Sequence, residues 1–558
     1  MLEAFCSVYR DMLYSMIMKK LPLAITTFAD IRDPNENYLY IDKTAFAYRL
    51  IDSGRYYFLS RPRRFGKSLF LDTLSDLLQS KKELFKGLAV YDKWNWDTSY
   101  PVMNISLNSG NFSSRESLTK SILHTLKNVQ RDLKIECDPQ SELSDCFDDL
   151  IKNAYDKYQQ KVVILIDEYD KPILDNIENR EQALVARDIL KSFYSVIKDN
   201  DRYIKFVFIT GVSKFSKMNL FSGLNNLTDI TIMSDYADIC GYTQNDIESH
   251  FAEHLVDVDL AKLKEWYNGY NYLGGEDKRV YNPFDILLFI TNGCKYKNYW
   301  WSTGNPSFLI KKLAQEDYYI PDLENIVASE EVLETFDVDN IDLVALLWQT
   351  GYLTFEEEIT RRGKIFYKLK LPNREIQSSL NELFIQYLTR QTNEAIRHQD
   401  HLYDALTGDI SDLEQALTAL FASIPYNNYA NKIIEKYEGY YSSVVYTYFM
   451  SLGYPTISED PTNIGRIDLT IQLPNRTVII EFKVDQPQQA MQGELPSGKR
   501  GHPGVEQIKE QKYYQKYQKP GANEIYIVGI NFSSEDKNIT EFEWERVWRV
   551  CLNNSCNR

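Results

Sequence analysis

Three short apolar runs, separated by stretches with helical periodicity, constrain the fold of this chain more than any other feature. The runs are YYFLS at 56–60, VVILI at 162–166 and FVFI at 206–209. Helical patterns lie between them, at residues 67–79 and 180–198. Strands that are apolar on both faces and are joined by helices form parallel sheets covered on both sides. The sequence therefore predicts an α/β fold built on a parallel sheet.

The loop after the first run contains a glycine-lysine-serine triplet, within SRPRRFGKSLF at residues 60–70. In a phosphate-binding loop, backbone N–H groups at the start of a helix surround the phosphates. Gly66 would let the backbone come close, Lys67 would reach the β- and γ-phosphates, and the Ser68 hydroxyl would coordinate Mg²⁺. The general pattern G-x-x-x-x-G-K-[ST] has glycine where this chain has Arg61. The alternative is a lysine at the exposed start of an ordinary helix.

The second and third runs end in polar residues that complete a nucleotide site. Asp167 at the end of the second run would hold Mg²⁺, and Glu168 would polarise the attacking water. Thr210 and Ser213, after the third run, are candidate sensors of the γ-phosphate. The alternative is that these are solvated strand ends. The predicted nucleotide-contacting residues are Arg61, Pro62, Arg63, Arg64, Phe65, Gly66, Lys67, Ser68, Leu69, Asp167 and Thr210.

Four stretches of the first half resemble one known family. They are FADIRDPNENYLYIDKT, LSRPRRFGKSLFLDTL, VVILIDEYDKPI and FITGVSKFSKMNLFSGLNNLTDIT. Together they are similar to the predicted AAA-ATPase-like family common in gut bacteria, and the resemblance extends over nearly the whole chain. It implies a P-loop ATPase domain that uses ATP and Mg²⁺. The loop of that family commonly reads RPRRFGKS, so Arg61 departs from the general motif and not from the family.

A second constellation lies near the C-terminus, in GRIDLTIQLPNRTVIIEFKV at 465–484. Glu481 and Lys483 are two residues apart and so face the same side of a strand. An antiparallel hairpin through the Pro-Asn turn can place Asp468 beside them. Two carboxylates can bind one or two Mg²⁺ ions at a phosphodiester, and Lys483 can orient water or neutralise charge. The alternative is a hairpin with ordinary surface charges.

This second constellation resembles the PD-(D/E)XK nuclease superfamily, a fold similar to restriction endonucleases. The resemblance implies a further acid on the preceding helix, matched by Glu438, and a helical glutamine, matched by Gln507. It also implies catalytic roles for Asp468, Glu481 and Lys483, with Asp468 and Glu481 as metal ligands. The polar loop at 485–504 would lie over a nucleic-acid backbone or would be an exposed loop.

The chain of 558 residues is too long for one core, and we expect four segments. Residues 1–17 are an optional extension, 18–235 an AAA-like ATPase domain, 236–400 a helical lid or winged-helix-like region, and 401–558 connector helices with the nuclease-like domain. Within the third segment, Thr243 is expected to cap a helix, and a hairpin is expected between LLWQTGYLTF and IFYKLKLP.

Bulk composition limits the choice of partners and location. The net charge of −16 argues against a protein coated in basic surface, so a nucleic acid would meet a local patch. The seven cysteines contain no C-x-x-C, which favours reduced thiols and a cytoplasmic location. No apolar run reaches about 18 residues, so no membrane span is expected. The leading hypothesis is an ATP-dependent nuclease acting on DNA, in defence, with a homo-oligomer as one option. The alternative is an ATP-switched signalling or scaffold protein whose nuclease-like domain only binds.

Overall fold

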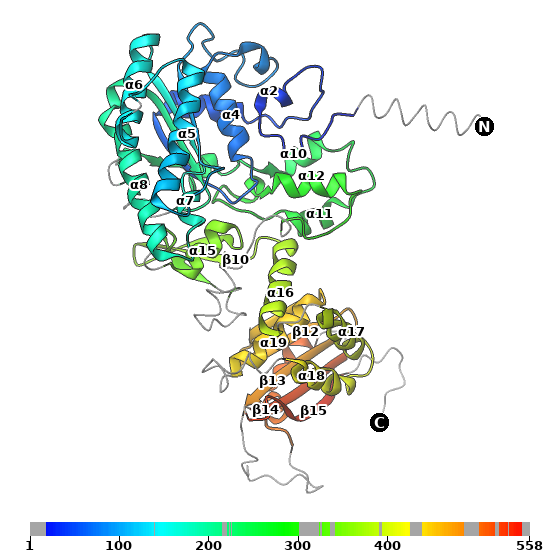
Figure 1. The fold of residues 1–558 in the computed structure, drawn as a ribbon. Coiled ribbons are helices and arrows are strands. Elements are labelled where there is room, and N and C mark those ends of the chain that lie inside the picture. Colours follow the sequence, from blue (N-terminus) through cyan, green and yellow to red (C-terminus); the bar gives the residue numbers. More distant parts are fainter. Residues whose placement is uncertain are drawn as a thin grey trace, which may run out of the picture. The chain divides into compact units, whose positions relative to one another are not determined.

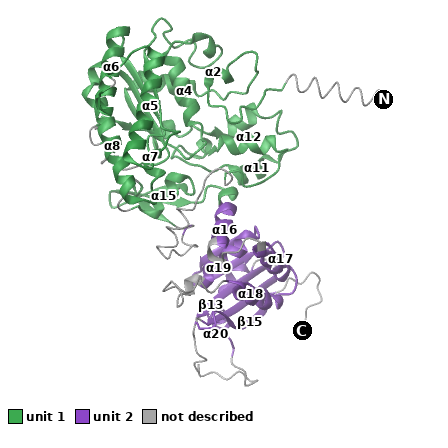
Figure 2. Ribbon diagram, viewed as in Figure 1, with its two compact units in different colours: residues 1–308, 326–376 green, residues 309–325, 377–558 purple. Residues whose placement is uncertain are grey.

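The computed structural model describes residues 18–138, 140–214, 220–221, 224, 226–300, 323, 326–334, 341–389, 393–424, 438–484, 501–518, 524–533 and 535–548. The chain forms two compact units (Figure 2), the first made of residues 1–308 with 326–376 and the second of residues 309–325 with 377–558. Within the described residues, no helix has both the length and the apolar composition needed to cross a bilayer.

A five-stranded parallel sheet forms the centre of the first unit and confirms the predicted fold class (Figure 1). Its order is β2-β3-β4-β1-β5, so β4 lies between the first and second predicted runs. The strands are β1 (Tyr56–Ser60), β2 (Val102–Ser106), β3 (Val162–Asp167), β4 (Ile204–Gly211) and β5 (Thr228–Asp229). The sequence did not predict β2 and β5, because both are short and β2 alternates between buried and exposed residues.

The register of the sheet brings the ends of its central strands to one edge. Ser60 at the end of β1 pairs with Gly211 at the end of β4, and Ile166 pairs with Ile209. The loop after β1, the acids after β3 and the turn after β4 therefore meet at the carboxyl edge, where parallel sheets bind ligands.

The helices of the sheet domain follow local sequence signals. The helix after the glycine-lysine-serine loop is α4 (Lys67–Leu78), whose buried face packs on β2, β3 and β4. Next come α5 (Arg115–Leu133) and α6 (Leu143–Tyr158), and α5 begins with a capping box between Ser114 and Ser117. The predicted helix at 180–198 is α8 (Arg180–Asp199). Shorter helices are α2 (Phe28–Ile31), α3 (Thr44–Ser53) and α7 (Lys171–Leu174).

A mainly helical region follows the sheet within the same unit. Thr243 caps its first helix as predicted, because its hydroxyl accepts the N–H of Asp246 at 3.1 Å. The expected hairpin is confirmed as an antiparallel pair, which β8 extends to a three-stranded sheet. The elements of this region are α10 (Gln244–His250), α11 (Leu260–Tyr267), α12 (Pro283–Thr291), α14 (Glu330–Glu334), α15 (Leu343–Thr350), β6 (Tyr242–Thr243), β7 (Val280–Tyr281), β8 (Val327–Ser329), β9 (Thr354–Arg361) and β10 (Lys364–Lys370).

The YIDKT segment ties the start of the chain to this helical region. Leu39 and Ile41 join a core cluster that includes Ile247 and Phe251. Lys43 Nζ lies 3.0 Å from Oδ2 of Asp246 in the first turn of α10, and each of the two side chains is 14% exposed. The YIDKT segment therefore packs the start of the chain against the helical region. Its sequence alone did not indicate this structural role.

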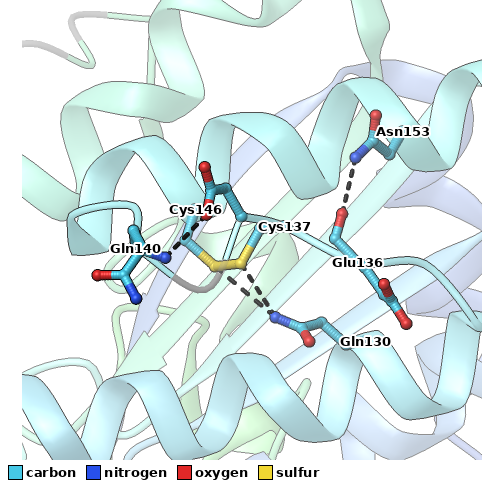
Figure 3. Close-up of a disulfide and its surroundings, with 7 residues drawn as sticks. Gln130, Glu136, Cys137, Gln140, Cys146 and Asn153 are labelled. Carbon is cyan, nitrogen blue, oxygen red and sulfur yellow. Dashed lines mark hydrogen bonds between the residues drawn. A yellow bond between two sulfur atoms is a disulfide. The ribbon is translucent and has the colours of Figure 1, made fainter.

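Cys137 and Cys146 form a disulfide, which corrects the expectation that the thiols are reduced (Figure 3). Cys137 follows α5 and Cys146 lies in the first turns of α6, so the short α5–α6 connection brings their Cα atoms to 5.1 Å. The Gln130 amide donates to both sulfur atoms, at 3.1 and 3.8 Å. A spacing of nine residues carries no sequence signal for this pairing. Two further described cysteines, Cys240 and Cys294, are free thiols.

The second unit contains a five-stranded mixed sheet in the order β11-β12-β13-β14-β15. Only β13 and β14 are parallel, and the other pairs are antiparallel. The predicted hairpin, β12 and β13, and the helix expected around Gln507 are confirmed, whereas β11 and β15 were not expected. The elements are α16 (Arg374–Thr389), which begins in the first unit, α17 (Asn393–Thr407), α18 (Asp412–Ser423), α19 (Glu438–Ser451), β11 (Thr456–Pro461), β12 (Arg466–Gln472), β13 (Arg476–Val484), α20 (Pro503–Glu510), β14 (Glu524–Ser533) and β15 (Asn538–Trp548).

Helix α20 covers one face of this sheet. Val505 and Ile508 pack in a buried cluster with Ile479, Ile525 and Ile527 from the two parallel strands. This apolar contact holds α20 against the strand that carries Glu481 and Lys483. Gln507 on α20 therefore lies next to Glu481 on β13.

Candidate functional site

The glycine-lysine-serine loop joins β1 to α4, the context that a phosphate-binding loop requires. Gly66 has a φ of +94°, in the region where other residues are strained, and it directly precedes the helix. The Gly66 carbonyl accepts the N–H of Phe70, so the helix hydrogen bonds begin here. Free backbone N–H groups at this helix start suit an anion.

Lys67 is folded back over the loop. Its side chain is almost buried, and Nζ donates to the carbonyls of Arg61 and Pro62, both at 3.0 Å. Burial lowers the pKa of Lys67, and the nearby carboxylates of Asp167 and Glu168 act against that shift. The ammonium therefore sits between the loop carbonyls and the acids of β3, where a phosphate could take the place of the carbonyls.

Ser68 at the start of α4 contacts Asp167 at the end of β3. The Ser68 hydroxyl donates to Asp167 Oδ2 at 2.6 Å. Glu168 follows with a φ of +51°, and burial raises the pKa of its carboxyl. A hydroxyl and a carboxylate in contact are hard oxygen ligands that fit Mg²⁺.

Arg61 lies in the core and its guanidinium does not reach toward the loop centre. It is 1% exposed, and Nη1 donates to the carbonyls of Ser60 at 2.9 Å and Thr231 at 2.7 Å. Nη2 donates to the Tyr236 carbonyl at 3.1 Å, and the Tyr272 ring centroid lies 3.6 Å from Cζ. Arg61 therefore anchors the start of the loop, and only its backbone carbonyl faces Lys67.

The other loop residues divide between packing and exposure. Phe65 is buried against the Tyr270 ring, with centroids 4.8 Å apart. Arg64 has a φ of +67° and lies 3.9 Å above the Phe284 ring. The predicted contacts Pro62, Arg63 and Leu69 are buried, exposed and half-buried, respectively.

At the end of β4 the structure shows a network that the sequence did not predict. The Thr210 hydroxyl donates to the Leu59 carbonyl at 3.0 Å, so it is bound to the backbone of β1. The fully buried Asp170 accepts the Ser213 hydroxyl at 2.5 Å and the Ser213 N–H at 2.6 Å. Lys214 then pairs with Asp229 at 3.0 Å in a buried ion pair. The sequence feature that could have pointed to Asp170 is its position three residues after Asp167.

The second unit brings together the acids and lysine expected from its hairpin. Glu481 is fully buried, and its Oε2 accepts the Gln507 amide N–H at 2.8 Å. Lys483 Nζ lies 3.5 Å from the same oxygen. Asp468 Oδ2 accepts the backbone N–H of Phe482 at 2.8 Å, which places Asp468 next to Glu481.

The electrostatics of this second site centre on Glu481. Burial, and next the adjacent Asp468 carboxylate, raise the pKa of Glu481 to about 8. Its Oε1 has no hydrogen-bond partner among the described residues. A buried carboxyl of this kind is stabilised by a proton or by a cation that takes the proton's place.

The ligand set for a metal at this site is incomplete within the described residues. Among the residues that the structure describes, no three His, Cys, Asp or Glu side chains form a metal-binding group, and Asp468 and Glu481 supply two carboxylates here. Glu438 is the first residue of α19, but its side chain lies outside the described residues. The two carboxylates are oxygen ligands that suit Mg²⁺ with water in the remaining positions.

Comparisons with known proteins match both halves of the chain. Residues 22–221 match a family described as "Predicted AAA-ATPase", and residues 436–542 match the "PD-(D/E)XK nuclease superfamily". A protein of Azotobacter chroococcum mcd 1, described as "Uncharacterized protein in vnfD 5'region", is 42% identical over 529 residues, which cover 94% of this chain and 99% of that protein. This chain therefore belongs to the family of predicted AAA-ATPases that carry a PD-(D/E)XK nuclease superfamily domain at the C-terminus.

Proposed function

We propose that this chain binds and hydrolyses ATP and that its second unit is a Mg²⁺-dependent nuclease that cuts DNA. The observation that carries the nuclease part is the buried Glu481, which contacts Gln507 and Lys483 and lies beside Asp468. A fully buried carboxyl with a raised pKa is costly to the fold unless it serves a ligand.

In the first unit, each residue of the loop has a task in ATP hydrolysis. Lys67 would exchange the carbonyls of Arg61 and Pro62 for phosphate oxygens. Ser68 and Asp167 would hold Mg²⁺, and Glu168 would polarise the attacking water. The raised pKa of Glu168 favours its acceptance of a proton from that water near neutral pH.

In the second unit, Asp468 and Glu481 would hold Mg²⁺, with Glu438 as a further acid. The bound metal would activate water and stabilise the negative charge of the phosphodiester transition state. Lys483 would orient the water or neutralise charge, while Gln507 keeps Oε2 of Glu481 in place. Cleavage of foreign DNA, in defence, and assembly into a homo-oligomer belong to this proposal as its biological setting.

One cleavage assay with a set of variants tests the nuclease part. The purified full chain is incubated with plasmid and with single-stranded DNA or RNA, with Mg²⁺ or EDTA and with or without ATP. We expect metal-dependent cleavage that Lys483→Ala abolishes, whereas Lys512→Ala, at an exposed position two residues after the end of α20, leaves it unchanged. Equal cleavage by wild type and Lys483→Ala would remove the nuclease assignment.

ATP binding and turnover separate the tasks of the first unit. We expect Lys67→Ala to lose ATP binding and Glu168→Gln to keep binding but lose hydrolysis. Unchanged turnover in both variants would contradict the ATPase assignment. Hydrolysis by a wild-type chain that cuts no nucleic acid would favour the alternative, an ATP-switched scaffold or signalling protein.

A further inference from the structure

His502 lies at the start of α20, beside the nuclease-like site. It is the N-cap residue of that helix and is 4% exposed. It lies near the end of the polar loop expected at 485–504, of which residues 485–500 lie outside the described residues, and none of the roles assigned above involves it. Its contacts link three elements of the second unit.

The His502 ring lies directly on the backbone of Gly529. A Cβ added at Gly529 would be 2.2 Å from Nδ1 and 2.8 Å from Cε1 of the ring. The register pairs Gly529 with Glu481 on one side and with Glu543 on the other. The ring therefore fills the space above β14 between these two glutamates, and only glycine at position 529 leaves room for it.

Two hydrogen bonds fix His502 at this place. Its Nδ1 accepts the N–H of Gly504 at 3.0 Å, and its backbone N–H donates to Glu543 Oε2 at 2.6 Å. An imidazole that accepts at Nδ1 and is kept neutral by burial carries its proton on Nε2. His502 thus joins the first turn of α20 to both β14 and β15.

The first turn of α20 sets the position of Glu481. A Cβ at Gly504 would be 3.1 Å from the Glu481 Cβ and 3.2 Å from His502 Nδ1, so the helix start touches β13 closely. Three residues further along the helix, Gln507 donates to Glu481 Oε2 at 2.8 Å. A small shift of this turn would move Gln507 away from the carboxylate.

We infer that His502 is a positioning residue of the nuclease-like site. Its ring on Gly529 and its bonds to Gly504 and Glu543 hold the first turn of α20 where Gln507 orients Glu481. It acts through Gln507 and Glu481 and contacts no substrate. This inference rests on the proposed nuclease function.

The test compares plasmid cleavage with Mn²⁺ and, separately, Mn²⁺ affinity by titration calorimetry, both on the full chain. His502→Ala should lower kcat and weaken Mn²⁺ binding by about 10–100-fold, the usual effect of losing a partner that orients a metal ligand. His502→Asn, whose side chain can still cap the N–H of Gly504, should stay within about threefold of wild type. His401→Ala, at an exposed position of α17, is the matched control and should change neither quantity.

The outcomes separate this inference from the proposed function. Cleavage by His502→Ala equal to that of wild type overturns the inference and leaves the nuclease function standing. If wild type does not cleave, the nuclease function fails. In that case the Mn²⁺ affinity of His502→Ala alone tests the inference. Weaker Mn²⁺ binding than wild type supports the positioning role, and equal binding overturns it. A wild type that neither cleaves nor binds Mn²⁺ overturns both.

Two further results guard against a folding artefact and against direct chemistry. If His502→Ala does not fold, Gly529→Ala replaces it, since it displaces the ring while keeping every polar group; undiminished cleavage there overturns the inference. Equal losses in the Ala and Asn variants, with unchanged thermal unfolding, also overturn it. The acting atom would then be Nε2, which has no partner among the described residues.

Discussion

Replacing Arg61 with glycine would complete the general G-x-x-x-x-G-K-S pattern, yet we expect it to damage the first unit. The guanidinium is fully inside the core and donates to the carbonyls of Ser60, Thr231 and Tyr236 at 2.9, 2.7 and 3.1 Å. Glycine would leave these carbonyls without their donor and would open a cavity beside the Tyr272 ring. The loop would gain freedom at the point where it is now held.

The size of the effect follows from the type of contact. Hydrogen bonds to a charged group contribute about 1.5–3 kcal/mol each, but their sum is reduced by the desolvation of the guanidinium. Each buried carbonyl left without its donor costs about 1–3 kcal/mol, and relief of the guanidinium's desolvation offsets part of that sum, so we expect Arg61→Gly to cost about 3–5 kcal/mol. The first unit spans about 360 residues, for which a shift of about 1.3 °C per kcal/mol predicts a Tm lower by about 4–7 °C.

Thermal unfolding and ATP affinity measure this prediction together. The control is Arg63→Gly, the same substitution two residues away at an exposed position, which should cost less than about 1 kcal/mol. We expect Arg61→Gly to bind ATP more weakly as well, because the Arg61 and Pro62 carbonyls that hold Lys67 lose their fixed place. A variant as stable as wild type that binds ATP equally well would refute the anchoring role.

Three further predictions concern the same chain. Burial raises the pKa of both Glu375 and the adjacent Asp285, so the stability of the first unit should fall as pH rises above about 4.5. Urea unfolding at pH 5 to 8 should show this slope in wild type, and the double variant Glu375→Gln with Asp285→Asn should flatten it; an unchanged slope in the double variant would contradict the assignment. Cys137→Ser should lower the free energy of unfolding by about 2–3 kcal/mol, because it removes the disulfide. Dithiothreitol should lower the free energy of unfolding of wild type by a similar amount and leave that of the variant unchanged. Cys294→Ser, which replaces a free thiol, is the control. Gly66→Ala should weaken ATP binding and cost about 1–2 kcal/mol in thermal unfolding because of the φ of +94°. The control is Gly363→Ala, where φ is +74° and an added Cβ meets nothing within 4 Å; it should cost a similar amount of stability and leave ATP binding unchanged.

The sequence predicted the strands and acids of both sites because these depend on local patterns. A uniformly apolar strand followed by polar residues, such as Val162–Asp167, is visible without any knowledge of its neighbours. The pairs Ser68–Asp167 and Glu481–Gln507 then came together because the order of strands and helices specifies which ends meet. Short or amphipathic edge strands were missed, since β5 has only two residues and β15 has no buried run.

The residues that the sequence could not place share another property: their partners are backbone atoms or glycines far along the chain. Arg61 bonds carbonyls some 170 residues away, and no side chain at those positions signals the contact. The position of the His502 ring depends on the absence of a side chain at Gly529, and nothing in the sequence distinguishes this glycine from the others. Arginine next to a phosphate-binding loop is ordinarily interpreted as a ligand contact, so the residue type pointed toward the phosphates. Burial decides otherwise, because the Arg61 guanidinium is enclosed in the core with Nη1 and Nη2 bound to carbonyls, away from the centre of the loop, so we expect the phosphate contacts to come from Gly66, Lys67 and Ser68.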